Sequence, residues 1–249
     1  MSTSRPVQSV SNAELYNRWA KVYDTDGNIL QALDDLLLPT LLTQLFTTIQ
    51  TSNPNSTTNS PTLTITELGA GTGRNTVKLL SPALSPSISI SHINALDLSP
   101  GMLEVARERC CKYLSAKTPS LAKDPEVAFF EFDALNPAKF LDVRTEVAGK
   151  ADVVLSTLVL EHLPIDVFFK TVRGLLRETG WLVLTNMHAE MGRLSQAGFV
   201  DEETGEKIRG ESYVYEVHEV LEEGNKWGFH LEGEVIERGW RKVMLGMEE

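Results

Sequence analysis

Cysteine is scarce in this chain, because only Cys110 and Cys111 occur among its 249 residues, and they are adjacent. They fall in a segment with a helical pattern, where neighbouring side chains point in different directions and suit neither a disulfide nor a metal site. The sequence therefore predicts a reduced, intracellular protein without a metal.

Positive charge is also in short supply, with 23 Lys and Arg residues against 34 Asp and Glu residues and a net charge of -11. A field of this sign repels phosphate backbones and anionic lipids, so we expect no nucleic acid and no membrane as partner. Residues 1–21 lack the apolar core of a signal peptide, and no uncharged apolar run is long enough to span a membrane. We expect a soluble, cytoplasmic protein, and the sequence leaves its oligomeric state open.

Apolar residues, in contrast, make up 42% of the chain, which is enough for a sizeable core. After residue 61 apolar runs alternate with helical patterns, as in repeated βαβ units. The expected strands are 63–67, a run ending at Asp97, 127–132, 151–157 and 180–187, and the expected helices are near 72–80, 101–116, 164–178 and 215–228. Two further runs, 229–237 and 240–247, predict a terminal hairpin. The pattern predicts an α/β fold with a doubly wound, mostly parallel, seven-stranded sheet and an antiparallel strand near the C-terminus.

The first fifty residues predict an N-terminal helical cap. Ser11 and Glu14 resemble a capping box that opens a helix to about Tyr23, and a second apolar stripe runs to Ile49, with Pro39 restarting or kinking it. Residues 51–61 are polar and rich in turn formers, which indicates a flexible linker.

The remaining residues, 62–249, form the predicted main domain. Within it, residues 188–212 are too polar and too interrupted by glycine for a regular element, so we expect an irregular insertion that serves as a substrate lid, with a plain solvated loop as the alternative.

Three glycines at alternating positions stand between an apolar run and a helical pattern in "TLTITELGAGTGRNTVKLL". A strand that turns directly into a helix gathers free backbone N–H groups at one point, and glycine lets a ligand approach them. The dinucleotide fingerprint would need glycine at position 74, which is Arg74, and this disfavours NAD. A tight turn without a ligand is the alternative.

The segment "ELGAGTGR" resembles motif I of the class I S-adenosylmethionine-dependent methyltransferases. Four further segments follow in the order of that family: "ALDLSPGMLEVARER", "FFEFDALN", "ADVVLSTLVLEHLP" and "LLRETGWLVLTNMH". The resemblance covers residues 67–188. It implies a Rossmann-like enzyme that transfers a methyl group from S-adenosylmethionine to a small-molecule acceptor by in-line displacement, leaving S-adenosylhomocysteine and requiring no metal.

The resemblance also implies a set of cofactor contacts that follow the strands. The set comprises Glu67, Gly69, Ala70, Gly71, Gly73, Arg74, Asp97, Leu98, Met102, Asp133, Ala134, Ser156, Thr157 and Leu158. Asp97 would accept hydrogen bonds from the ribose hydroxyls, while Leu98 and Met102 flank the adenine. Asp133 would bind the adenine amino group, and the backbone N–H of Ala134 the ring. Helix capping for Asp97 and a turn for Asp133 are the alternatives.

The methionine part of the cofactor would meet the other members of this set. Glu67 would fix its ammonium group through water or the backbone, and Arg74 would reach its carboxylate. Ser156, Thr157 and Leu158 would line the methionine chain and the methyl group. A helix-dipole partner for Glu67 and a solvated surface residue for Arg74 are the alternatives.

Tyr16, Trp19 and Tyr23 lie at helical spacing in "YNRWAKVYD", which by itself indicates packing on a core. The segment also resembles one in small-molecule and quinone-type methyltransferases whose aromatic residues close over the cofactor. Because a sulfonium is a cation and aromatic faces attract cations, we expect these three residues to border the cofactor pocket.

A general base is needed only if the acceptor loses a proton. His162 is the first candidate and His188 the second, with packing or capping as the alternative for both. No "NPPY"-type motif follows the fourth strand, which disfavours nucleobase or glutamine methylation. Oxygen, nitrogen, sulfur and carbon acceptors stay open, as do a protein methyltransferase and a cofactor-binding protein that transfers no methyl group.

Overall fold

The computed structural model describes residues 7–52, 62–81, 88–118, 123–202 and 204–238. Its centre is a five-stranded sheet in the order β4-β3-β2-β5-β6. These strands are β2 (Thr62–Leu68), β3 (Ser89–Asp97), β4 (Glu126–Glu131), β5 (Ala151–Thr157) and β6 (Leu176–Thr185), and each pair is parallel. The chain winds outward from β2 to β4 and then resumes at β5 on the other side, so the winding reverses between β2 and β5. The predicted α/β fold with a doubly wound parallel sheet is confirmed.

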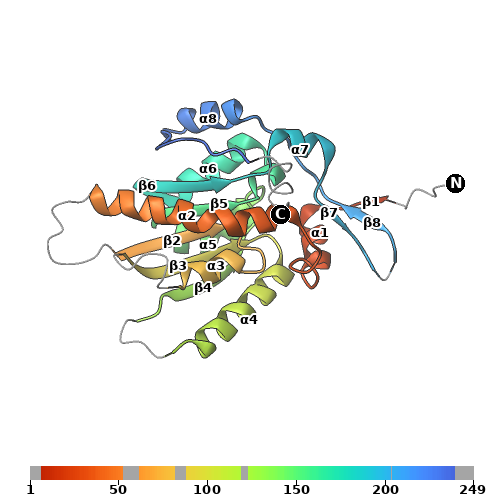
Figure 1. The fold of residues 1–249 in the computed structure, drawn as a ribbon, viewed down its shortest axis with the longest axis horizontal. Helices are drawn as coiled ribbons and strands as arrows, with labels where there is room; N and C mark the ends of the chain where they lie inside the picture. The colour runs from red at the N-terminus through yellow and green to blue at the C-terminus, as the bar shows by residue number, and fades with distance from the viewer. Residues whose placement is uncertain (1–6, 53–61, 82–87, 119–122, 203, 239–249) are drawn as a thin grey trace, which may run out of the picture.

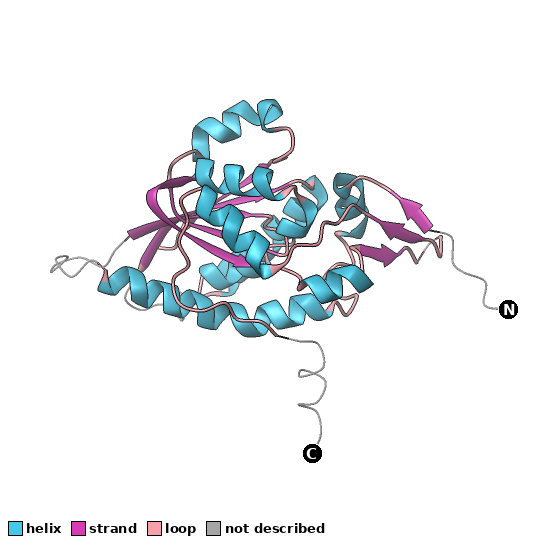
Figure 2. Cartoon of the chain, turned by 90° about the horizontal axis from the view of Figure 1, so that it is seen from above, coloured by secondary structure: helices cyan, strands magenta, loops and turns pink. Residues whose placement is uncertain are grey.

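Helices cover both faces of this sheet (Figures 1 and 2). One core joins it to α2 (Ile29–Thr51), α3 (Arg74–Leu79) and α4 (Pro100–Ala116), and the other to α5 (Leu141–Val147), α6 (Ile165–Leu175) and α8 (Val217–Lys226). The central strand β5 shows why its sequence is continuously apolar. Val153 and Leu155 belong to the first core and Val154 to the second, so successive side chains enter opposite layers.

Among the described residues, α2 is the helix long and apolar enough to cross a membrane by length and composition. In this structure Leu38, Leu42 and Phe46 of α2 lie buried in the first core. The helix runs through Pro39 without restarting there. Its length therefore serves to cover one face of the sheet.

A second, small sheet stands apart from the main one at the right of Figure 1. It consists of β1 (Val7–Ser9), β8 (Lys207–Arg209) and β7 (Gly198–Val200), with β1 parallel and β7 antiparallel to β8. The N-terminal segment thereby pairs with the insertion, which also contains helix α7 (Ala189–Leu194). The prediction that residues 188–212 are irregular was wrong, because strands of three residues leave no readable period and one of them, β8, also pairs with the distant N-terminal strand β1.

The N-terminal helix α1 (Asn12–Trp19) is shorter than expected. It begins as predicted, with the Ser11 hydroxyl accepting a hydrogen bond from Glu14 N at 3.2 Å, but it ends four residues before Tyr23. Leu15 and Trp19 form a third cluster with Ile208 of β8. The small sheet is thus packed on α1.

Two expectations about the C-terminal half also need correction. Residues 229–237 form no strand, while 240–247 lie outside the described residues, so the described part of the main sheet has five parallel strands and not seven. Phe229 packs against the second core, but the side chains of Leu231, Val235 and Ile236 stay exposed, so the rest of this run buries no apolar face.

Strand β6 begins at Leu176, inside the segment expected to be helical. Gly180, expected as the turn into this strand, lies within it, where a Cβ atom would come within 3.0 Å of the Ala151 carbonyl oxygen. Close approach of β5 therefore explains this glycine.

Two shorter elements complete the chain. The 3₁₀ helix η1 (Pro137–Phe140) precedes α5, and η2 (Leu160–His162) follows β5. The second of these places a histidine beside the carboxyl end of the central strand.

Candidate functional site

The glycine loop follows β2 at the point where the winding reverses. Gly69, Gly71 and Gly73 all have positive φ angles, of 79°, 54° and 76°. A Cβ atom on Gly69 would meet Val159 Cγ2 at 2.1 Å, and one on Gly73 would meet Ala106 Cβ at 2.9 Å. Gly71 differs, because nothing lies within 4 Å of its Cβ position. Packing accounts for the first and third glycines, whereas the middle one faces open space that a ligand can enter.

Asp97 ends β3 next to this open space. Its Oδ2 accepts a hydrogen bond from Gly71 N at 2.7 Å, and its Oδ1 accepts one from Ser99 N at 2.8 Å. Ser99, and not Asp97, caps α4, since its hydroxyl accepts a hydrogen bond from Met102 N. Each carboxylate oxygen can accept a further donor, and burial raises the pKa of Asp97 to about 6. This arrangement fits a ligand with two neighbouring hydroxyls, as a ribose has.

Glu67 lies near the end of the neighbouring strand β2, just before the glycine loop, and 1% of its surface is exposed. Its Oε2 accepts a hydrogen bond from the Thr76 hydroxyl at 2.6 Å, while its Oε1 has no partner among the described residues. Burial raises the pKa of Glu67 to about 8. A buried carboxyl oxygen without a partner is costly, so it fits a ligand that brings a donor or a cation.

Arg74 is neither solvated nor free. Its Nη1 pairs with Asp35 Oδ1 at 2.7 Å, and its guanidinium lies 3.9 Å from Asp24 and from Asp34. The N-terminal cap therefore already neutralises this arginine. Its predicted reach to a cofactor carboxylate stays a prediction.

Asp34 is the buried centre of a polar network that sequence reasoning missed. Its oxygens accept hydrogen bonds from Asn75 Nδ2 at 2.9 Å and from the Thr185 hydroxyl at 2.8 Å. Asn75 Nδ2 also donates to Thr157 Oγ1 at 2.9 Å. One carboxylate thus joins α2 to α3, β6 and the end of β5. In the sequence Asp34 stands beside Asp35 in an apolar helical stripe, and nothing there distinguishes the buried carboxylate from the exposed one.

The predicted aromatic residues of the N-terminal segment do gather. The ring centroids of Tyr16 and Trp19 lie 5.8 Å apart, and those of Trp19 and Tyr23 lie 5.0 Å apart. Trp19 also stacks on Phe199 of β7 at 5.4 Å. Phe199 was not predicted, because it comes from the insertion.

His162 joins this aromatic cluster. Its Nε2 lies 2.7 Å from the Tyr16 hydroxyl, and its Nδ1 lies 3.2 Å from the Glu211 carbonyl oxygen. A carbonyl can only accept, so Nδ1 carries a proton, and in the neutral imidazole Nε2 then accepts the hydrogen bond from Tyr16. The neighbouring Glu161 is buried, and its Oε1 lies 4.0 Å from His162 Nε2. Burial raises the pKa of Glu161, and its Oε2 has no partner among the described residues.

His188, the second candidate base, has a different place. Its Nδ1 accepts a hydrogen bond from Glu190 N at 3.2 Å and caps α7, and its Nε2 lies 3.0 Å from Glu237. These contacts give His188 a capping role.

The predicted residues Ser156, Thr157 and Leu158 lie at the carboxyl end of β5. The Ser156 hydroxyl donates to the Leu68 carbonyl at 3.2 Å, and Thr157 receives the hydrogen bond from Asn75. Leu158 has a φ of 57°, which is rare for a residue other than glycine and marks strain where functional sites concentrate.

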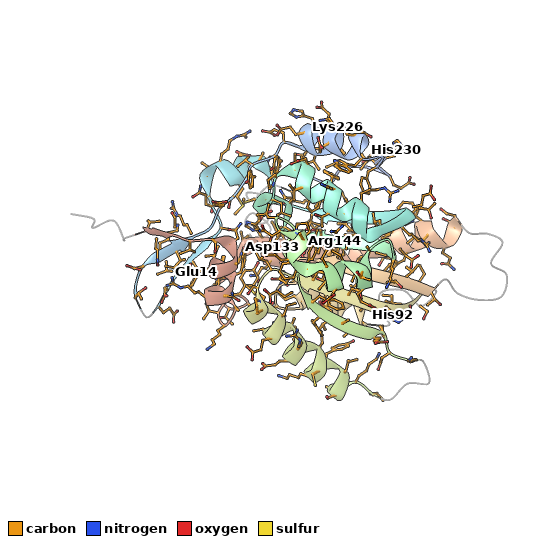
Figure 3. All side chains as sticks on the ribbon, turned by 180° about the vertical axis from the view of Figure 1, so that it is seen from behind. Glu14, His92, Asp133, Arg144, Lys226 and His230 are labelled. Atoms are coloured by element: carbon orange, nitrogen blue, oxygen red, sulfur yellow. The ribbon has the colours of Figure 1, made fainter. Side chains whose placement is uncertain are left out.

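The predicted adenine contacts lie beyond β3 and β4. Met102, Ala134 and Ala70 of the glycine loop are buried, and Leu98 is partly exposed. Asp133 accepts hydrogen bonds from Leu135 N at 2.8 Å and Asn136 Nδ2 at 2.7 Å, so it also stabilises its own turn. Figure 3 shows Asp133 at the end of the sheet nearer to Glu14 of α1, with His92 toward the opposite end.

Known proteins share both the sequence and the fold. A family model described as "Methyltransferase domain" matches residues 66–182. An uncharacterized methyltransferase from Emericella nidulans is 41% identical over 235 residues, covering 92% of this chain and 79% of that protein.

Two solved structures are similar at 18% identity, which shows a common fold. The complex titled "DhpI-SAM-HEP" has a TM-score of 0.55, with 88% of this chain and 91% of that chain covered. The magnesium protoporphyrin IX methyltransferase from Synechocystis PCC 6803 with bound SAH has a TM-score of 0.50, with 91% and 90% covered.

Proposed function

Because this chain belongs to the class I S-adenosylmethionine-dependent methyltransferases, we propose that it methylates a small organic molecule. One observation carries the proposal: the Tyr16 hydroxyl contacts His162 Nε2 at 2.7 Å, so the N-terminal helix meets the segment after β5. The small sheet packs on the same helix through Trp19 and Phe199. A protein acceptor would need an open groove at this edge, whereas an enclosed edge suits a small acceptor.

The cofactor supplies a methyl group on a sulfonium, which is a good leaving group, so the protein mainly has to position the reactants and exclude water. Asp97 would hold the ribose through its two carboxylate oxygens, and the backbone at Gly71 leaves room for the ligand. The unpartnered Oε1 of Glu67 would receive an ammonium donor. Tyr16, Trp19 and Tyr23 would keep water from this edge.

Where the acceptor loses a proton, we propose that His162 receives it through Tyr16. The acceptor proton would move to the Tyr16 oxygen while the Tyr16 proton moves to His162 Nε2, and Nδ1–H stays on the Glu211 carbonyl. Burial raises the pKa of Tyr16 well above its usual value, so the phenol keeps a proton throughout. Glu161, 4.0 Å away, would stabilise the imidazolium.

The experiment supplies methyl-labelled S-adenosylmethionine and two fractions of a cell extract, a deproteinised metabolite filtrate and the dialysed protein fraction. We expect label to enter a small molecule of the filtrate and no protein. Asp97→Ala serves as the control for transfer that depends on the cofactor site. Label confined to protein would contradict the small-molecule acceptor, and no transfer from a chain that binds S-adenosylhomocysteine would favour a protein that transfers no methyl group.

A further inference from the structure

The side chain of Asn17 joins helix α1 to the loop between β3 and α4 and to the first turn of α4. Its Oδ1 accepts a hydrogen bond from the Ser99 hydroxyl at 2.7 Å and another from Gly101 N at 3.0 Å. Sequence reasoning assigned Asn17 no role, although it stands between the aromatic residues of the same helix.

Ser99 connects this contact to the predicted ribose site. It is fully buried, its backbone N donates to Asp97 Oδ1 at 2.8 Å, and its hydroxyl accepts from Met102 N at 3.1 Å. A hydroxyl has a single proton to donate, and here that proton goes to Asn17. Asn17 therefore completes the hydrogen bonding of the residue that holds one carboxylate oxygen of Asp97.

Gly101 provides the second half of the contact. Its amide belongs to the first turn of α4, where backbone N–H groups have no partner inside the helix. A Cβ atom at Gly101 would come within 3.2 Å of Asn17 Oδ1 and 3.5 Å of Ala20 Cβ. Glycine therefore allows α1 to approach the start of α4 closely enough for Asn17 to accept this hydrogen bond.

We propose that Asn17 is a positioning residue for cofactor binding, which fixes the segment from Asp97 to Gly101 and attaches α1 to it. The inference rests on the proposed role of Asp97 in holding the ribose. The N-terminal helix would then do more than cover the site, because its Asn17 side chain orients the Asp97 carboxylate that binds the ligand.

The chemistry of the contact predicts which substitutions preserve it. Both hydrogen bonds use the side-chain oxygen as an acceptor, so aspartate, which has the same shape, can accept both. Its added charge would lie at the N-terminus of α4, where the helix dipole favours a carboxylate. Alanine at this position removes the acceptor.

The test compares the dissociation constant of S-adenosylhomocysteine for the wild-type chain, Asn17→Asp, Asn17→Ala and Asn12→Ala. Asn12 is the matched control, because it lies on the same helix and makes two hydrogen bonds of its own, to the backbone of Glu211. Asn17→Ala should raise the dissociation constant about tenfold, which corresponds to the loss of one or two hydrogen bonds. Asn17→Asp and Asn12→Ala should stay within about threefold of the wild type.

Amide hydrogen exchange at Gly101 in the free protein gives a second measurement. It should be faster in Asn17→Ala and unchanged in Asn17→Asp. Faster exchange with unchanged affinity in Asn17→Ala would overturn the proposal, as would an aspartate variant as weak as the alanine variant. An equal loss of affinity in Asn12→Ala would also overturn the proposal, because it would show that attachment of α1 in general, and not Asn17 in particular, supports binding. If the wild-type chain failed to bind, the cofactor site itself would be refuted, which is a distinguishable result.

Discussion

Two residues define the predicted cofactor site, Gly71 and Asp97, which are joined by a hydrogen bond of 2.7 Å. Each contributes a property that few other residues supply. Gly71 combines a positive φ angle with an open Cβ position, and Asp97 offers two oriented acceptor atoms beside it. A backbone donor, a carboxylate and free space thus lie together at the switch point of the sheet, which is where ligands bind in doubly wound folds.

Gly71→Ala separates the role of the backbone from the role of the open space. Gly149 is its matched control, because its φ is 66° and nothing lies within 4 Å of its Cβ position either. Both alanine variants should lower the free energy of unfolding by about 1–2 kcal/mol, the cost of a left-handed conformation for an L-residue. Only Gly71→Ala should also weaken binding of S-adenosylhomocysteine, measured by calorimetry. Equal affinity in the two variants would show that no ligand uses the space beside Gly71.

The contact between Tyr16 and His162 leads to a second prediction about single residues. With the acceptor that the labelling experiment identifies, Tyr16→Phe and His162→Ala should each lower kcat by about 10²–10⁴-fold, the usual contribution of general acid–base catalysis. The double variant should lose little more, because two groups in one proton path act as a unit. Affinity for S-adenosylhomocysteine should change little. Fully additive losses in kcat would contradict a shared path.

Among the helices, α1 and α2 are each joined to the edge of the sheet by polar contacts as well as by apolar packing. Asp34 of α2 binds Asn75 and Thr185, and Asp24, before α2, accepts a hydrogen bond from the Thr72 hydroxyl at 2.8 Å. Arg74 lies between these two carboxylates. The contacts fix the N-terminal cap against the glycine loop.

Asp34→Ala tests this attachment, with Asp35→Ala as the control on the same helix. The Asp34 side chain is 2% exposed and that of Asp35 is 48% exposed. Loss of Asp34 removes one of the two acceptors of Asn75 Nδ2 and the acceptor of the partly buried Thr185 hydroxyl, and it should lower the free energy of unfolding by about 2–4 kcal/mol. Loss of Asp35 should cost at most about 1 kcal/mol. Urea denaturation measures both. Similar losses would show that the buried network contributes no more than a surface ion pair.

The elements also show what the sequence can predict. The five main strands were predicted to within a few residues, because each contributes apolar residues to both cores. The small sheet was missed, since Val7–Ser9 pairs with Lys207–Arg209 across most of the chain. The glycine loop and Asp97 could be predicted from local motifs. Asn17, Asp34 and Phe199 could not, because their roles depend on contacts between distant segments.

In the whole molecule, the N-terminal segment and the insertion after β6 meet at one edge of the sheet. Residues 7–23 and the insertion around Phe199 share a cluster that lies beside His162, while the opposite ends of the strands carry none of the predicted site residues. The net charge of -11 suits a cationic cofactor and a neutral or cationic acceptor better than a phosphorylated one. The fold shows a methyltransferase, and the charge and the enclosed edge support the proposal that its acceptor is a small molecule.

The most direct test is calorimetric titration of the wild-type chain and Asp97→Ala with S-adenosylhomocysteine, beside the same titrations with NAD. We expect saturable binding of S-adenosylhomocysteine by the wild type and no binding of NAD. Asp97→Ala should bind more weakly by about 1.5–3 kcal/mol, the value of hydrogen bonds to a charged group. Binding of NAD in preference to S-adenosylhomocysteine, or equal affinity in Asp97→Ala, would contradict the assignment of this edge of the sheet as the cofactor site.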